Sequence, residues 1–137
     1  MTDFLSALRG FLLANSDVVA LVSKSVYVLS LPKDEIALGP HKVVVLVAAG
    51  GSMGDAKRTV AEARVDLVCF GETDYDAMQL DMVVAEAVKW MNRAYYNGVL
   101  LHNATVSGGP IQARDPEILW PCMRRQAMIR ADERKVG

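Results

Sequence analysis

The residues that could take part in chemistry are few, and the first group is a glycine-rich run. Gly50-Gly51-Ser52-Met53-Gly54-Asp55-Ala56-Lys57 follows a strongly apolar segment. A phosphate-binding loop needs a lysine directly after its last glycine and then a helix, so that main-chain N–H groups and the helix dipole meet the phosphate. Here two residues separate the last glycine from the lysine, and a strand-like segment follows. We therefore interpret residues 49–56 as a mobile hairpin tip, which a neighbour in an assembly could order.

The two histidines are the second group. His41 stands where a loop meets a strand, and His102 lies inside a strand-like segment. Neither has a cysteine or carboxylate at metal-ligand spacing, so we expect no metal site and no cofactor. Ser52 and Ser107 lie in glycine-containing loops without the context of a nucleophile elbow. A small hydrolase stays open as an alternative, because a catalytic triad assembles from residues far apart in the sequence.

Three carboxylates, Glu72, Asp74 and Asp76, form the last group. Paired acids catalyse proton transfer when burial separates their pKa values. These three surround Thr73, which is a good N-cap for a following helix, and acidic residues favour the positive end of a helix dipole. Helix capping explains them, and we expect no catalytic residues.

Composition narrows the class of protein. The chain has 137 residues, of which 52 % are hydrophobic and 23 % charged, and its net charge is −1. Such a chain forms one domain with a core and carries no overall field that would attract nucleic acid or an anionic membrane. No signal peptide or membrane span is expected, since Asp3 and Arg9 interrupt the N-terminal apolar residues. We read Cys69 and Cys122 as buried free thiols of a soluble protein made in a reducing cytosol.

Apolar periodicity predicts the elements that position these residues. Two short helices fill residues 3–22, and residues 25–31 are extended. Residues 32–40 read as a loop, because they contain two prolines and a glycine. Strands are expected at 42–48, 58–70, 99–107, 111–113 and 120–131.

One long amphipathic helix begins at Thr73. Apolar residues recur along it at helical spacing, and Asn97-Gly98 is interpreted as its left-handed stop. We expect Tyr75 to pack where the helix begins. Trp90 is read as a core aromatic, with an interface anchor as the alternative. The apolar stripe consists of Ala77, Leu80, Val84, Ala87, Val88, Met91 and Tyr95.

The predicted fold class follows from this order. It is α+β, with a mainly antiparallel sheet that includes a long β-hairpin and with helices packed on one face. Residues 1–131 form the single domain, and residues 132–137 form a charged tail.

Arg125 is anomalous within the last strand. Met123, Ala127 and Ile129 share a strand face with it, and a charge on an apolar face is awkward in a monomer. Either Arg125 sits at a sheet edge or bulge, or this strand lies at a subunit contact, where arginine is enriched. Arg124 and Arg125 are therefore candidate interface residues, together with Gly50, Gly51, Ser52 and Met53.

The strand and helix of residues 64–88 resemble a pattern in the tail-terminator, or tail-completion, proteins of long-tailed bacteriophages. The matching features are V-D-x-x-C at Val65–Cys69 and T-x-x-x-A at Thr73–Ala77. Flanking segments are also similar to the family pattern: D-V-x-x-L-V at residues 17–22, V-Y at 26–27, L-P at 31–32 and V-V-V at 43–45. The chain departs from the pattern just before residue 43, where His41-Lys42 replaces a proline.

The resemblance implies a structural virion protein and no enzyme. Such a protein caps the head-proximal end of the tail tube as a ring, usually hexameric, and presents a surface to head-side connectors. Its partners would be copies of itself, the tail tube protein and a head-tail connector protein. It would be located in the virion tail, and in the host cytoplasm during assembly. Another neck or tail-tube component, or a host-side adaptor with a simple dimer interface, are the alternatives.

Overall fold

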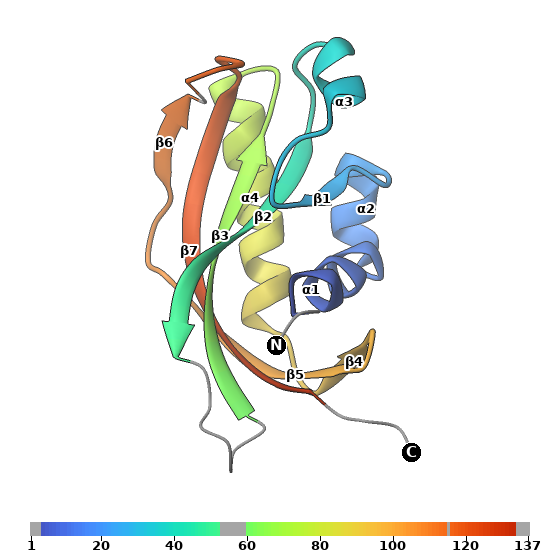
Figure 1. Cartoon of the computed structure of the whole chain (residues 1–137). Helices are drawn as coiled ribbons and strands as arrows, with labels where there is room; N and C mark the ends of the chain where they lie inside the picture. Colours follow the sequence, from blue (N-terminus) through green and yellow to red (C-terminus); the bar gives the residue numbers. More distant parts are fainter. Residues whose placement is uncertain (1–3, 53–59, 115, 134–137) are drawn as a thin grey trace.

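The computed structural model describes residues 4–52, 60–114 and 116–133. The described residues form helices and strands in the order α-α-β-α-β-β-α-β-β-β-β (Figure 1). Their bounds are α1 (Phe4–Leu13), α2 (Ser16–Val22), β1 (Val26–Val28), α3 (Lys33–Ala37), β2 (Val43–Ser52), β3 (Val60–Phe70), α4 (Asp74–Lys89), β4 (Ala94–Tyr96), β5 (Val99–Val106), β6 (Ile111–Arg114) and β7 (Pro121–Glu133).

The strands form one mixed sheet in the order β1-β2-β3-β7-β5-β4, and β6 pairs with β7 beyond the end of β5. The β1–β2 pair is parallel, and each of the other pairs is antiparallel. The longest ladders join β3 to β2 and to β7. The predicted α+β class, with a mainly antiparallel sheet and a long β2–β3 hairpin, is confirmed.

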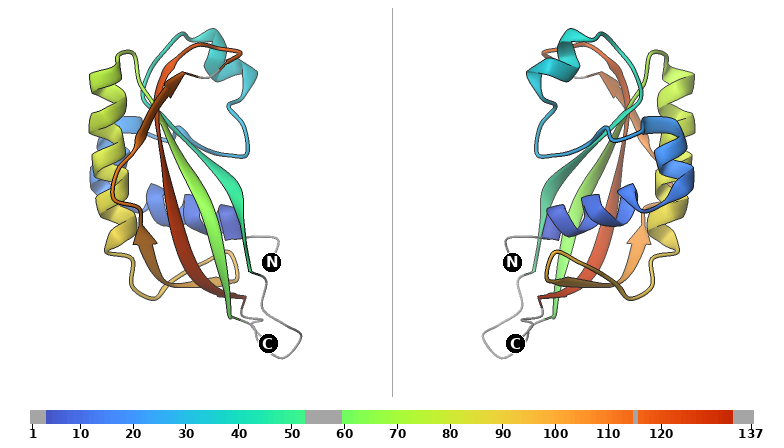
Figure 2. Two further views of the ribbon diagram at one scale, coloured as in Figure 1. Left: turned by 90° about the vertical axis from the view of Figure 1, so that its left-hand side faces the viewer. Right: turned by 90° about the vertical axis from the view of Figure 1, so that its right-hand side faces the viewer.

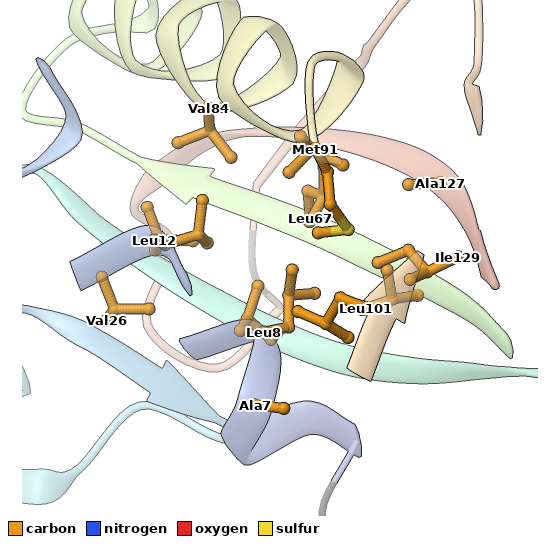
Figure 3. Close-up of a cluster of buried hydrophobic side chains, with 14 of the residues drawn as sticks. Ala7, Leu8, Leu12, Val26, Leu67, Val84, Met91, Leu101, Ala127 and Ile129 are labelled. Carbon is orange, nitrogen blue, oxygen red and sulfur yellow. The ribbon is translucent and has the colours of Figure 1, made fainter. Parts of the chain in front are cut away.

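One face of the sheet is covered by α1, α2 and α4, which enclose the main core. Figure 3 shows side chains of α1, α4 and the sheet meeting in one layer. Leu8, Leu12, Leu80 and Ile129 are completely buried there. Each buried leucine or isoleucine contributes about 1.5–3 kcal/mol to folding, so this layer dominates stability.

A second, smaller cluster covers part of the opposite face. It lies at the end of the sheet near α3, called here the α3 end, and α3 lies on the side of the sheet opposite α4 (Figure 2). β2 therefore buries both of its faces at this end, as its uninterrupted apolar sequence predicts. At the other end, the hairpin end, Arg64, Gln126 and Arg130 of the same face are exposed. The second cluster consists of Val43, Val45, Val68, Phe70, Trp120 and Cys122.

Local signals set several helix boundaries. The Thr73 hydroxyl accepts a hydrogen bond from the Asp76 N–H at 3.1 Å, as expected for the N-cap of α4. Asn15 likewise caps α2, because its side-chain oxygen accepts from the N–H groups of Asp17 and Val18 at 3.0 and 3.1 Å. Among the described residues no single helix is long and apolar enough to cross a membrane. Only α1 and α2 together meet that test, and they bend by 89°.

Two predictions about local structure are wrong. The segment 32–40 is not entirely loop, because Pro32 stands at the N-cap of the short helix α3. The long helix ends at Lys89, well before Asn97-Gly98. Asn97 and Gly98 have φ of 51° and 80° and form the turn between β4 and β5. Positive φ at both central residues is what a tight β-hairpin needs, so the same dipeptide serves a strand turn instead of a helix end.

Candidate assembly surfaces

The β2–β3 hairpin carries the first group of predicted interface residues. Gly50, Gly51 and Ser52 continue β2 instead of forming a loop, since Gly51 pairs with Ala63 and Ser52 with Glu62. The ladder shifts register between Ala48 and Gly51, which marks a β-bulge. Glycine is tolerated in a strand at such a position, where it absorbs the extra residue. Met53 lies outside the described residues.

Among the described residues, no helix lies between the glycine run and β3. The next element that the structure describes is the strand β3, beginning at Val60. A helix N-terminus is what directs N–H groups and a dipole toward a bound phosphate. The described part of the hairpin therefore gives a phosphate no such support.

Arg125 is partly buried and lies at a gap between two ladders, because β7 pairs with β5 as far as Ala127 and with β6 from Arg124, so that no described strand pairs with Arg125 on that side. β7 pairs with β3 in unbroken register through Arg125, which lies opposite Leu67. Its Nε and Nη2 donate to the two carboxylate oxygens of Asp81 in α4, at 3.1 and 2.7 Å, and its Nη1 donates to the Ser107 carbonyl at 3.0 Å. Only 13 % of the Arg125 side chain and 1 % of the Asp81 side chain are exposed. The hydrogen bonds from Arg125 to Asp81 raise the pKa of the guanidinium, so Arg125 stays charged.

Arg124 points to the opposite face and is a surface residue. Half of its side chain is exposed, and its Nε lies 3.6 Å from Asp66 Oδ2. It also lines a pocket of about 260 Å³ whose walls include Leu31, Phe70 and Ile118. An exposed arginine beside apolar side chains has the composition typical of interfaces. Of the two arginines, Arg124 is thus the one that another protein reaches without breaking an internal ion pair.

His41 is engaged in a hydrogen-bonded cluster around Glu35. The two ring nitrogens lie 2.9 Å from Glu35 Oε2 and 2.7 Å from the Gly39 carbonyl oxygen. The hydroxyls of Ser25 and Tyr27 both donate to the other carboxylate oxygen, Oε1. Ser25 thus donates its hydrogen bond to the carboxylate and not to the imidazole. A serine nucleophile activated by histidine needs its hydroxyl to be bonded to the imidazole, so this is not the arrangement of a catalytic triad. The cluster instead ties α3 to β1.

This cluster shifts two pKa values in opposite directions. The Tyr27 hydroxyl is the largest cause of the lowered pKa of Glu35, because its hydrogen bond favours the carboxylate. The same hydrogen bond to Glu35 raises the pKa of Tyr27, because ionisation of the phenol would remove the donor. Both shifts keep Glu35 charged and Tyr27 neutral near pH 7, which is the state that holds the cluster together.

The remaining chemical candidates are dispersed. His102 Nε2 lies 3.9 Å from Asp132 Oδ2, while Asp74 Oδ2 lies 3.7 Å from Arg114 Nη2. Within the described ranges no group of three or more histidine, cysteine or acidic side chains is arranged to hold a metal ion. Cys69 and Cys122 are buried and form no disulfide. Burial raises the pKa of the Cys69 thiol well above its ordinary value.

The outer face of α4 was not predicted. Trp90 and Tyr75 are each 70 % exposed, so the prediction of a core tryptophan and a packing tyrosine is wrong. Met78 and Met82 lie between them on the same helix and are 40 % and 62 % exposed. The spacing of Tyr75, Met78 and Met82 at i, i+3 and i+7 is a helical stripe that the sequence already contains. The inward stripe of the same helix is longer, so it masks this outward stripe in the apolar pattern.

The fold has a counterpart among solved structures. No protein-family model matches the chain. No curated protein matches it either. A chain in the virion of a native gene transfer agent particle is similar, with a TM-score of 0.61 and 19 % sequence identity over 94 % of each chain. At this level of identity the likeness shows a shared fold.

Proposed function

We propose that this chain is a structural virion protein of the tail-terminator kind, which caps the head-proximal end of a phage-type tail tube as a ring. The observation that carries the proposal is the fold shared, over 94 % of both chains, with a component of a gene transfer agent virion. The tail-terminator pattern at Val65–Cys69 and Thr73–Ala77 supports the more specific role.

An assembly role is also favoured over a catalytic one. The polar pairs Arg125 with Asp81 and His41 with Glu35 join elements of the fold to one another. Tyr75, Met78 and Met82 form an exposed apolar stripe on α4, and exposed apolar patches mark sites of protein contact. A small hydrolase built on His41 or His102 is the weaker proposal. It predicts that replacing both histidines with alanine abolishes an activity while assembly persists.

The proposed ring consists of copies of this chain, in the number of six that the resemblance implies. A contact between two different surfaces, repeated around an axis, closes into a ring at one rotation angle. We propose the Gly50–Met53 end of the hairpin and the β7 surface at Arg124 as the contact regions, with Arg125 holding β7 to α4 behind that surface. The tail tube protein and a head-tail connector protein would bind the two ends of the ring. The protein would then act in the virion tail, after assembly in the host cytoplasm.

The test is the mass and shape of the protein in solution. We expect native mass spectrometry to find a species of about six times the 14.9 kDa subunit mass, and negative-stain images to show rings, alone or on tube ends. Arg124→Glu should weaken this species, whereas Lys24→Glu, at another exposed position, should not. A strictly monomeric protein that binds no tube end would contradict the proposal. Growth into long tubes by the protein itself would instead identify a tube component.

A further inference from the structure

One edge of the sheet is open for part of its length. β1 pairs with β2 only at Val44–Leu46. The chain then leaves the edge at Leu29, which has a φ of 75°. From Val47 to Ser52, no strand among the described residues pairs with the outer side of β2. These residues therefore offer main-chain donors and acceptors to another strand.

The direction of the main-chain groups follows from the observed bonds to β1. The Val44 N–H donates to the Ser25 carbonyl at 3.0 Å, and the Leu46 carbonyl accepts from the Leu29 N–H at 2.8 Å. Because main-chain groups alternate along a strand, those of Ala48 point to the same outer side. Ala48 is exposed although α1 packs beside β2. Ala48 is more exposed than its neighbours Val47 and Ala49, so the open edge is accessible there.

The composition of this edge is unusual for a monomer. Folded proteins guard a free edge with lysine, proline or another charged residue, because an unguarded edge recruits further strands. Val47-Ala48-Ala49-Gly50-Gly51-Ser52 contains neither a charge nor a proline. The bulge after Ala48 bends the strand but adds no charge. The edge is thus suited to a partner strand.

A matching edge lies on the other side of the same sheet. β6 pairs with β7 through Ile111–Arg114, and no described strand covers its other side. Ile111 is 70 % exposed there. β2 runs parallel to β7 and β6 antiparallel to it, so two copies placed side by side would bring β2 and β6 together antiparallel. Antiparallel pairing is the more stable arrangement per residue.

The two open edges are also offset from each other along the strand direction. β6 is level with the α3 end of the sheet, because Ala113 lies opposite Cys122 and Cys122 opposite Phe70. The open part of β2 extends toward the hairpin end. Joining them requires neighbouring strands to be staggered, and a staggered register with tilted strands is what closes a sheet into a barrel.

We propose that the outer edge of β2 in one copy pairs antiparallel with the outer edge of β6 in the next copy, so that the sheet continues around the ring. This rests on the proposed ring function, and it names the contact that builds the ring. The occupant of the β2 edge is a second copy of this chain.

The decisive variant is Ala48→Pro. Proline removes the outward N–H of Ala48 and blocks strand addition, and an outward edge position is where a sheet tolerates proline. We expect the isolated subunit to keep its circular dichroism spectrum and its thermal midpoint. We expect its rings to dissociate at about tenfold higher protein concentration, the effect of about one lost main-chain hydrogen bond per contact. Ala48→Thr retains the N–H at the same position and should assemble like the parent protein. Rings of Ala48→Pro as stable as those of the parent would overturn the proposal.

Cysteine cross-linking gives a readout that does not depend on ring stability. Ala48→Cys combined with Gln112→Cys should form disulfide-linked ladders of subunits under mild oxidation, because paired strands bring Cα atoms within the roughly 4.4–6.8 Å that a disulfide spans. The native Cys69 and Cys122 are buried and should not contribute. Linked dimers of Ala48→Cys alone would show two β2 edges pairing with each other and would overturn the proposal.

The two proposals fail differently. Ladders without rings or tube binding would support the β2–β6 contact and contradict the tail-terminator function. Rings that bind tube ends but give no ladders from the double variant would leave the function standing and overturn this contact. A protein that gives neither rings nor ladders would contradict both.

Discussion

Replacing Arg125 with methionine should destabilise the subunit strongly. The change removes the two charged hydrogen bonds, of 3.1 and 2.7 Å, that reach the Asp81 carboxylate. It leaves that carboxylate 1 % exposed and without its cation. Methionine has a similar length and fits an apolar strand face, so the loss of charge pairing dominates the effect.

The magnitude follows from the burial of the pair. Breaking a buried ion pair by removing one partner costs about 3–5 kcal/mol, because a desolvated charge is left uncompensated. A domain of this size is stable by about 5–15 kcal/mol, so the variant would lose a large part of its stability. Replacing both partners, as in Asp81→Leu with Arg125→Met, removes both charges and should cost less than about 1.5 kcal/mol.

Urea unfolding followed by circular dichroism, at a concentration where the protein is monomeric, measures these differences. Arg124→Met is a matched control, because its ion pair with Asp66 spans 3.6 Å and the arginine is half exposed. An exposed pair contributes about 0–1 kcal/mol, so this control should unfold close to the parent midpoint. The reasoning would be refuted if Arg125→Met cost less than the control, or if the double variant were as unstable as the single one.

Two further predictions concern stability. The pKa of Glu35 is lowered in the folded protein, so Glu35 stabilises the fold at pH values above its ordinary pKa of 4.5, and this stabilisation is lost as the pH falls below that value. Glu35→Gln should therefore flatten the acid side of a plot of the urea midpoint against pH. An unchanged plot would contradict this. A Cβ at Gly71 would lie 2.5 Å from the main-chain nitrogen of Ala77, so Gly71→Ala should cost about 1–3 kcal/mol in a thermal melt. Gly108→Ala, with nothing within 4 Å of the added carbon, should melt like the parent; equal losses in both variants would show that crowding is not the cause.

Local patterns predicted much of the fold. The cap at Thr73 and the inward stripe of α4 depend on neighbouring residues in the sequence, and both have the expected geometry as far as Val88. Tyr95, the predicted last member of the stripe, instead lies in β4 and is 45 % exposed. The apolar run of β2 correctly indicated burial on both faces. The Asn97-Gly98 dipeptide was ambiguous, since it ends helices and also forms tight strand turns. The choice depends on whether residues 94–96 find a partner strand, which local sequence does not determine.

The candidate surfaces were harder to predict. Arg125 pairs with Asp81, which lies 44 positions away in the sequence. A signal for this pair was present, because an acid interrupts the apolar stripe of the helix and a base interrupts the apolar face of the strand. The prediction that Trp90 is buried was wrong because large apolar residues are also found at protein surfaces. Whether the Trp90 side chain is exposed depends on where the helix ends. The predicted interface at Gly50, Gly51, Ser52, Met53 and Arg124 stays a prediction.

The position of β7 also bears on how the chain folds during synthesis. This strand lies in the middle of the sheet, between β3 on one side and β5 and β6 on the other, yet it is the last of the strands to leave the ribosome (Figure 1). Until residues 121–133 emerge, β5 and β6 have no central strand to join. Pairing between residues so distant in sequence is slow and leaves strand edges exposed meanwhile. Premature termination before β7 would therefore yield a chain prone to aggregation, instead of a subunit that merely lacks one strand.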